Sequence, residues 1–122
     1  MEDLGSILRE LGEKVPGCEF VSLVGKDGLT VFSHVVETKH DPGLVDAEVA
    51  NIFNACRMAA TGIGIKRQIE LIWVTESNFF VIYPIGEDFF LYMMLGVERS
   101  NPGLARVELR RASKRVAEII SS

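Results

Sequence analysis

The residue types that most often carry chemistry are few in this chain, which holds only two histidines and two cysteines. His34 falls in an expected strand and His40 in a polar loop, and neither belongs to a metal-ligand pattern. Cys56 falls on the apolar side of an expected helix, which favours core packing over nucleophilic chemistry. Because Cys18 also lies in apolar surroundings, we expect two free thiols in a reducing compartment, with no metal, no cofactor and no catalytic set.

One glycine pair resembles a phosphate-binding loop but stands in the wrong place. Gly62 and Gly64 precede Lys66 and Arg67. A phosphate loop follows a strand and opens a helix, whereas this segment would close a helix and open a strand. We therefore interpret the two glycines as the end of a helix.

A basic face marks the helix expected over residues 104–120. Its apolar stripe is Ala105, Leu109, Ala112, Val116, Ile119 and Ile120. Its opposite side carries Arg106, Arg110, Arg111, Lys114 and Arg115. Such a face could meet lipid, nucleic acid or an acidic protein, but Glu108 and Glu118 dilute it. Because the net charge is −4, we favour a solvated helix face and expect no nucleic-acid binding.

The helix expected over residues 46–64 organises the rest of the chain. The apolar side of this helix carries Val49, Ile52, Phe53, Cys56, Ala59 and Ala60. Its other side carries Ala47, Ala50, Asn51, Asn54, Met58 and Thr61, with Arg57 as the only formal charge. An uncharged outward face indicates either a helix buried twice within its own domain or a helix that meets a partner. We favour the partner, and we interpret Asp46 as the N-cap.

The remaining patterns predict one α+β domain over residues 1–122 with the order α-β-β-α-β-β-β-α. The expected elements are residues 2–14, 18–24, 29–36, 46–64, 68–75, 79–85, 89–97 and 104–120. The short connections between strands favour an antiparallel sheet, and the helices must cover both of its faces. No apolar run is long enough to insert into a membrane, and no signal peptide is present, so we expect a cytoplasmic protein.

Four stretches of the chain together resemble the roadblock/LC7 domain, including the bacterial gliding-motility type that regulates a Ras-like GTPase. These stretches are VPGCEFVSLV, GKDGLTVFS, AEVANIFNACRMAATGIG and NPGLARVELRRASKRVAEII. Their order and spacing agree, and the resemblance covers nearly the whole chain. It implies a profilin-like fold with strand order 2-1-5-4-3, the central helix on one face and the terminal helices on the other.

The same resemblance implies a non-enzymatic homodimer paired through the central helix and the strand over residues 68–75. Unpaired, that apolar edge strand would be an aggregation hazard. The implied dimer interface is Ala47, Ala50, Asn51, Met58, Ile69, Leu71, Ile72 and Trp73. The implied partner is a Ras-like small GTPase, bound at Asn54, Arg57 and Thr61, with or without stimulation of GTP hydrolysis. The family pattern gives no basis for treating Arg57 as an arginine finger.

A small-molecule sensor of the profilin, PAS or GAF type is the alternative to this interaction module. A sensor needs polar groups that converge inside an apolar cavity. The candidates for that role are Ser22, Ser33, Tyr83 and Tyr92. An enzyme is not favoured, because the chain offers no acid, base and nucleophile at matching positions.

Overall fold

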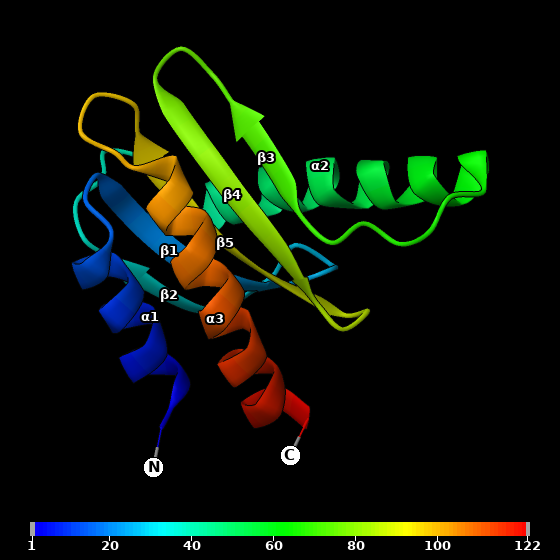
Figure 1. Ribbon diagram of the computed structural model, residues 1–122, viewed down its shortest axis with the longest axis horizontal. Coiled ribbons are helices and arrows are strands. Elements are labelled where there is room, and N and C mark those ends of the chain that lie inside the picture. Colours follow the sequence, from blue (N-terminus) through cyan, green and yellow to red (C-terminus); the bar gives the residue numbers. More distant parts are fainter. Residues whose placement is uncertain (1, 122) are drawn as a thin grey trace.

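Eight elements follow one another in the predicted order in the computed structural model, which describes residues 2–121 (Figure 1). The helices are α1 (Leu4–Lys14), α2 (Pro42–Ile63) and α3 (Pro102–Ser121). The strands are β1 (Cys18–Gly25), β2 (Thr30–Val35), β3 (Leu71–Val74), β4 (Asn78–Ile85) and β5 (Phe89–Gly96).

The five strands form one antiparallel sheet in the order β2-β1-β5-β4-β3. The predicted α+β fold and its strand order are therefore confirmed. Short turns join β1 to β2, β3 to β4 and β4 to β5, and each such turn forces neighbouring strands to run in opposite directions. Strand β5 lies in the middle, and its residues from Phe90 to Leu95 are buried on both faces of the sheet.

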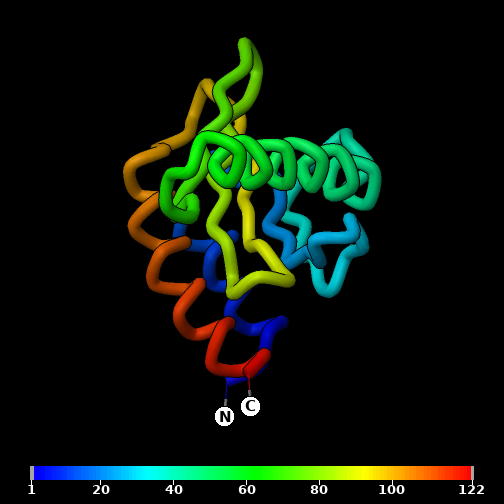
Figure 2. Tube along the Cα trace, turned by 90° about the vertical axis from the view of Figure 1, so that its right-hand side faces the viewer, coloured from blue at the N-terminus to red at the C-terminus, as the bar shows by residue number. Residues whose placement is uncertain are grey.

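Two apolar layers cover the sheet, one on each face. Helices α1 and α3 lie together on one face, while α2 runs across the strands on the other (Figures 1 and 2). Alternate side chains of β5 serve the two layers, because successive strand residues point to opposite faces. Leu91 and Met93 belong to the core under α1 and α3, whereas Phe90 and Tyr92 belong to the core under α2.

Helix α2 begins earlier than its predicted start at residue 46. Asp41 is the N-cap, and its carboxylate accepts a 3.1 Å hydrogen bond from the backbone N–H of Gly43. Pro42 occupies the first turn, where its missing N–H costs nothing and its fixed φ suits a helix. The prediction that Asp46 caps the helix is therefore wrong. At its other end the helix closes at the glycines, as predicted, since Gly64 is the C-cap with a φ of 82°.

Strand β3 is shorter than the predicted strand over residues 68–75. The residues before Leu71 are held by side-chain contacts outside the ladder. The Gln68 amide donates a 3.1 Å hydrogen bond to the carbonyl of Phe53 on α2. Glu70 accepts a hydrogen bond from the Tyr83 hydroxyl and pairs with Arg106 of α3 at 2.9 Å. The pairing of β3 with β4 therefore begins at Leu71, and the residues before it are held to α2, β4 and α3 through side chains.

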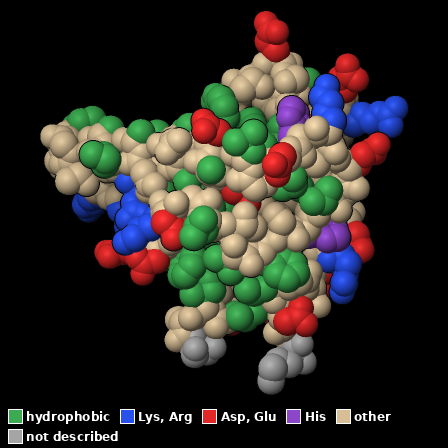
Figure 3. All heavy atoms as spheres, turned by 180° about the vertical axis from the view of Figure 1, so that it is seen from behind, with side chains coloured by type: hydrophobic (Ala, Val, Ile, Leu, Met, Phe, Trp, Pro, Cys, Tyr) green, Lys and Arg blue, Asp and Glu red, His purple; other side chains and the backbone are tan. Residues whose placement is uncertain are grey.

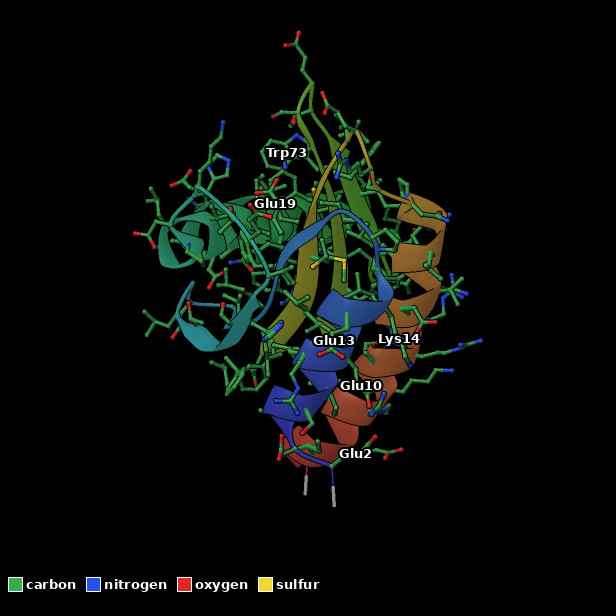
Figure 4. All side chains as sticks on the ribbon, turned by 90° about the vertical axis from the view of Figure 1, so that its left-hand side faces the viewer. Glu2, Glu10, Glu13, Lys14, Glu19 and Trp73 are labelled. Atoms are coloured by element: carbon green, nitrogen blue, oxygen red, sulfur yellow. The ribbon has the colours of Figure 1, made fainter. Side chains whose placement is uncertain are left out.

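Ion pairs join the two helices that share a face. Arg115 of α3 pairs with Glu2 and, at 3.2 Å, with Glu10 of α1. Lys14 of α1 lies 4.0 Å from Glu108 of α3. Figure 4 labels Glu2, Glu10 and Lys14, which lie on the side of α1 where α3 packs. The start of α1 and the end of α3 consequently lie at the same end of the molecule (Figure 1).

Candidate partner-binding surface

The second half of α2 extends beyond the sheet (Figure 1), and its side chains include the exposed apolar Met58 and Ile63. The segment 64–70 then returns from this projecting end to β3. Exposed apolar residues on the helix end, the returning segment and β3 are Met58, Ile63, Ile65, Ile69, Ile72, Trp73 and Val74. We call this set the α2–β3 surface. In Figure 3 the projecting end is lined with hydrophobic side chains, and such a set on one side of a small domain marks an interaction site.

Trp73 occupies the free edge of the sheet within this surface. Its ring stacks on Phe80 of β4 with centroids 4.6 Å apart, and the side chain remains 39% exposed. The register continues inward from Phe80 to Met94 and then to Phe20, both of which are buried. Strand β3 pairs only with β4 within residues 2–121. Its outer backbone groups are therefore open to another strand.

The predicted dimer-interface residues differ in how exposed they are to solvent. Asn51, Met58, Ile69, Ile72 and Trp73 are exposed. Ala47 and Leu71 are half-buried, and Leu71 packs against the core under α2. The pairing of two chains through these residues stays a prediction.

Ala50 does not belong to that surface. The side chain is only 3% exposed and lies in the core under α2. A Cβ placed at Gly28 of the β1–β2 turn would lie 3.7 Å from the Cβ of Ala50. Its place in the predicted interface is therefore corrected. Ala50 is small because the turn approaches the helix closely, which is a packing requirement within the chain rather than a requirement for a partner.

The predicted GTPase-contact residues make bonds within the chain. Asn54 donates a 2.8 Å hydrogen bond to the carbonyl of Lys26, and Arg57 donates one of the same length to the carbonyl of Glu87. These bonds fasten α2 to the β1–β2 and β4–β5 turns. Thr61 is exposed and donates to the carbonyl of Arg57 in its own helix. Contact of the three residues with a partner stays a prediction.

Asp46 is the residue that the sequence reasoning misjudged most. It is fully buried on the side of α2 that packs on the sheet. Its carboxylate accepts hydrogen bonds from the Tyr92 hydroxyl, at 2.5 Å, and from the Thr30 hydroxyl. A buried carboxylate is costly unless it is hydrogen-bonded. The spacing already pointed inward, because Asp46 precedes buried Val49 and Phe53 by three and seven residues.

The residues suited to chemistry remain apart. Burial raises the pKa of the Cys18 thiol to about 12, which leaves it a poor nucleophile. Cys56 is half-buried rather than part of the core that was predicted for it. Both cysteines are free thiols. Within residues 2–121 no three His, Cys, Asp or Glu side chains are grouped so as to hold a metal ion.

The polar side chains considered for a sensor pocket satisfy one another instead. The Ser22 and Ser33 hydroxyls lie 2.5 Å apart across β1 and β2, and Tyr92 bonds to Asp46. The hydroxyl of Tyr83, whose side chain is also buried, donates to Glu70. Since these groups are already paired, they do not favour a ligand cavity in the core.

The basic face of α3 was predicted to be solvated, but most of its cations pair with acidic side chains. Arg106 and Arg110 lie 2.9 Å and 3.9 Å from carboxylate oxygens of Glu70, and Arg115 pairs with α1. Arg111 pairs with Glu108 along the helix at 3.4 Å. Lys114 has no ion pair among residues 2–121.

Comparison with known proteins gives a likeness of structure rather than of sequence. No protein-family model matches the chain, and no curated protein matches it. A roadblock/LC7 domain from Streptomyces avermitilis superposes with a TM-score of 0.85 at 19% identity, covering 99% of this chain and 100% of that one. The gliding protein MglB from Thermus thermophilus superposes with a TM-score of 0.84 at 20% identity, covering 94% and 86%.

A further MglB structure, described as having a tetrameric arrangement, superposes with a TM-score of 0.84 at 19% identity and covers 94% of this chain and 85% of that one. At these identities the comparison establishes the fold. This chain has the roadblock/LC7 fold, as the resemblance implied. No helix within the described part of the chain is long and apolar enough to cross a membrane.

Proposed function

We propose that this protein is a dimeric, non-enzymatic regulatory module of the cytoplasm that pairs through the α2–β3 surface and binds a Ras-like small GTPase. The observation that carries the pairing is Trp73, which is stacked on Phe80 but left 39% exposed beside an open strand edge. A partner strand on β3 would satisfy the edge and cover this ring.

A second copy of the chain suits this edge because a symmetric contact places the same patch on both subunits. Pairing of β3 with its copy would join the two sheets. The projecting end of each α2, with Met58 and Ile63 exposed, then has apolar surface available for the other subunit. The tetrameric arrangement of the superposable MglB supports self-association by chains of this fold.

The GTPase contact follows from the resemblance to gliding-motility regulators and from the outward side of α2. Exposed residues recur there at helical spacing as Leu44, Glu48, Asn51, Ala55 and Met58. Glu48 is the only charge in that stripe, and a mostly uncharged centre with few charges is typical of specific interfaces. Thr61 lies exposed toward the end of the same helix, while Asn54 and Arg57 hold the helix in position.

The test is titration of a Ras-like GTPase encoded beside this gene, loaded with GDP or with a GTP analogue. We expect binding that prefers one nucleotide state and that is weakened by Thr61→Arg and by Ala55→Arg, at exposed positions of α2 outside the predicted dimer interface. The control variant is Arg111→Ala, on an exposed part of α3 on the opposite face. Absence of binding in both nucleotide states, or loss of binding in Arg111→Ala alone, would contradict the proposal.

A further inference from the structure

A groove of about 740 Å³ opens between the end of α2, the segment 64–70 and α3. Four cationic side chains line it, namely Arg57, Arg67, Arg110 and Lys114. Ala60, Ile65, Ile69 and Pro84 give it apolar walls. Figure 3 shows Lys and Arg side chains beneath the projecting end of α2, with acidic side chains nearby.

The acidic residues of the groove do not balance these cations. Glu70 and Glu87 also line it. Glu70 is already occupied, because it accepts from Tyr83, pairs with Arg106 outside the groove and lies 3.9 Å from Arg110 within it. Arg67 and Lys114 make no ion pair with any described residue. A chain with a net charge of −4 therefore carries a local excess of positive charge here.

We propose that this groove binds an extended, acidic segment of a partner protein. Successive side chains of an extended peptide point to opposite sides. A segment that alternates carboxylates with apolar residues therefore presents both kinds of side chain, and the groove offers cations at Arg67 and Lys114 and apolar residues at Ile65 and Ile69 to receive them. Hydrogen bonds between carboxylates and charged donors are the stronger ones, so the cations supply both attraction and direction.

The groove is separate from the sheet edge on which the proposed pairing depends. No residue of β3 lines it, but Ile65 and Ile69 of the α2–β3 surface do, and so do Arg57 and Thr61, which were predicted to contact a GTPase. The peptide proposal is therefore tested through Arg67 and Lys114, which line the groove but belong neither to the α2–β3 surface nor to the predicted GTPase contacts.

The test uses fluorescence anisotropy of a short labelled peptide in which Glu and Leu alternate, with an otherwise identical Gln–Leu peptide as the uncharged probe. The groove variant is Arg67→Glu with Lys114→Glu. The matched control is Lys39→Glu with Arg99→Glu, which makes the same charge change at two exposed residues outside the groove. Ile72→Lys tests whether the α2–β3 surface takes part.

We expect the wild-type protein to bind the acidic peptide and not the Gln–Leu peptide. The groove variant should weaken binding by about tenfold or more, since reversing contact charges turns attraction into repulsion, while the control and Ile72→Lys leave it unchanged. The proposal is overturned by an equal loss in the matched control, by no binding of the acidic peptide, or by binding that is lost only in Ile72→Lys. Binding of phosphatidylserine vesicles through the same cations, without peptide binding, would also overturn it.

Discussion

The hydroxyl of Tyr92 on β5 donates a 2.5 Å hydrogen bond to the carboxylate of Asp46 on α2, inside the core. The Thr30 hydroxyl of β2 donates to the same carboxylate. These two bonds tie the helix to the centre and to the edge of the sheet. They anchor the start of α2 to the sheet, while the bonds of Asn54 and Arg57 to two turns hold the helix further along.

Tyr92→Phe should destabilise the protein by about 1–3 kcal/mol, because the buried Asp46 carboxylate loses one of its two donors. Urea unfolding followed by circular dichroism measures the change. Tyr83→Phe is the matched control, since its partner Glu70 keeps the ion pair with Arg106. An equal loss in the two variants would show that the buried bond has no special role in holding α2.

Glutamate substitutions at Ala50 and at Ala55 compare a core position of α2 with a surface position of the same helix. Ala50→Glu would bury a charge without a partner, so we expect a loss of about 3 kcal/mol or more in the free energy of unfolding. Ala55→Glu, at an exposed position of α2, should change that free energy by about 0.5 kcal/mol or less. Thermal unfolding measures the loss of stability in the two variants. A stable, monomeric Ala50→Glu protein would contradict the placement of Ala50 in the core.

Alkaline pH should destabilise the protein in part through Cys18, whose pKa burial raises from 9.0 to about 12. The unfolded chain then loses the thiol proton at a lower pH than the folded chain does. The stabilisation is therefore complete below about pH 9 and is lost as pH rises toward 12, at about 1.4 kcal/mol per pH unit for a single group. Urea unfolding across this range should show a shallower fall in Cys18→Ala, and identical slopes would contradict the assignment.

Most of the fold was predictable because local signals agreed with one another. Alternating apolar residues in short runs, joined by tight turns, required neighbouring antiparallel strands. The run over residues 89–97 is apolar at nearly every position, which is typical of a strand buried on both faces, and β5 lies in the middle of the sheet. The start of α2 was harder, because Asp41, Pro42 and Gly43 look like a loop in isolation but form an N-cap and a first turn here.

The candidate site was less predictable, since it depends on contacts between distant parts of the chain. The Cβ of Ala50 faces the turn at Gly28, and only the fold brings these residues together. Asn54 looked like an outward polar residue, yet its amide bonds to the carbonyl of Lys26. The projecting end of α2 follows from where the sheet stops beneath the helix, which no helical pattern in the sequence specifies.

The proposed pairing of two chains through β3 should be weakened by one charge at the edge. Ile72→Lys would place a lysine at the centre of the proposed contact, where desolvation of an unpaired charge is costly. Val35→Lys makes the same change at an exposed position on β2, the opposite edge of the sheet. It therefore controls for the general effect of a lysine on an edge strand.

Sedimentation equilibrium of the wild-type protein and these two variants over a range of concentrations tests the central claim most directly. We predict a dimer for the wild type and for Val35→Lys, and a monomer or a much weaker dimer for Ile72→Lys. A wild-type protein that remains monomeric at the highest concentration, or a dimer that Val35→Lys dissociates and Ile72→Lys does not, would contradict pairing through the α2–β3 surface.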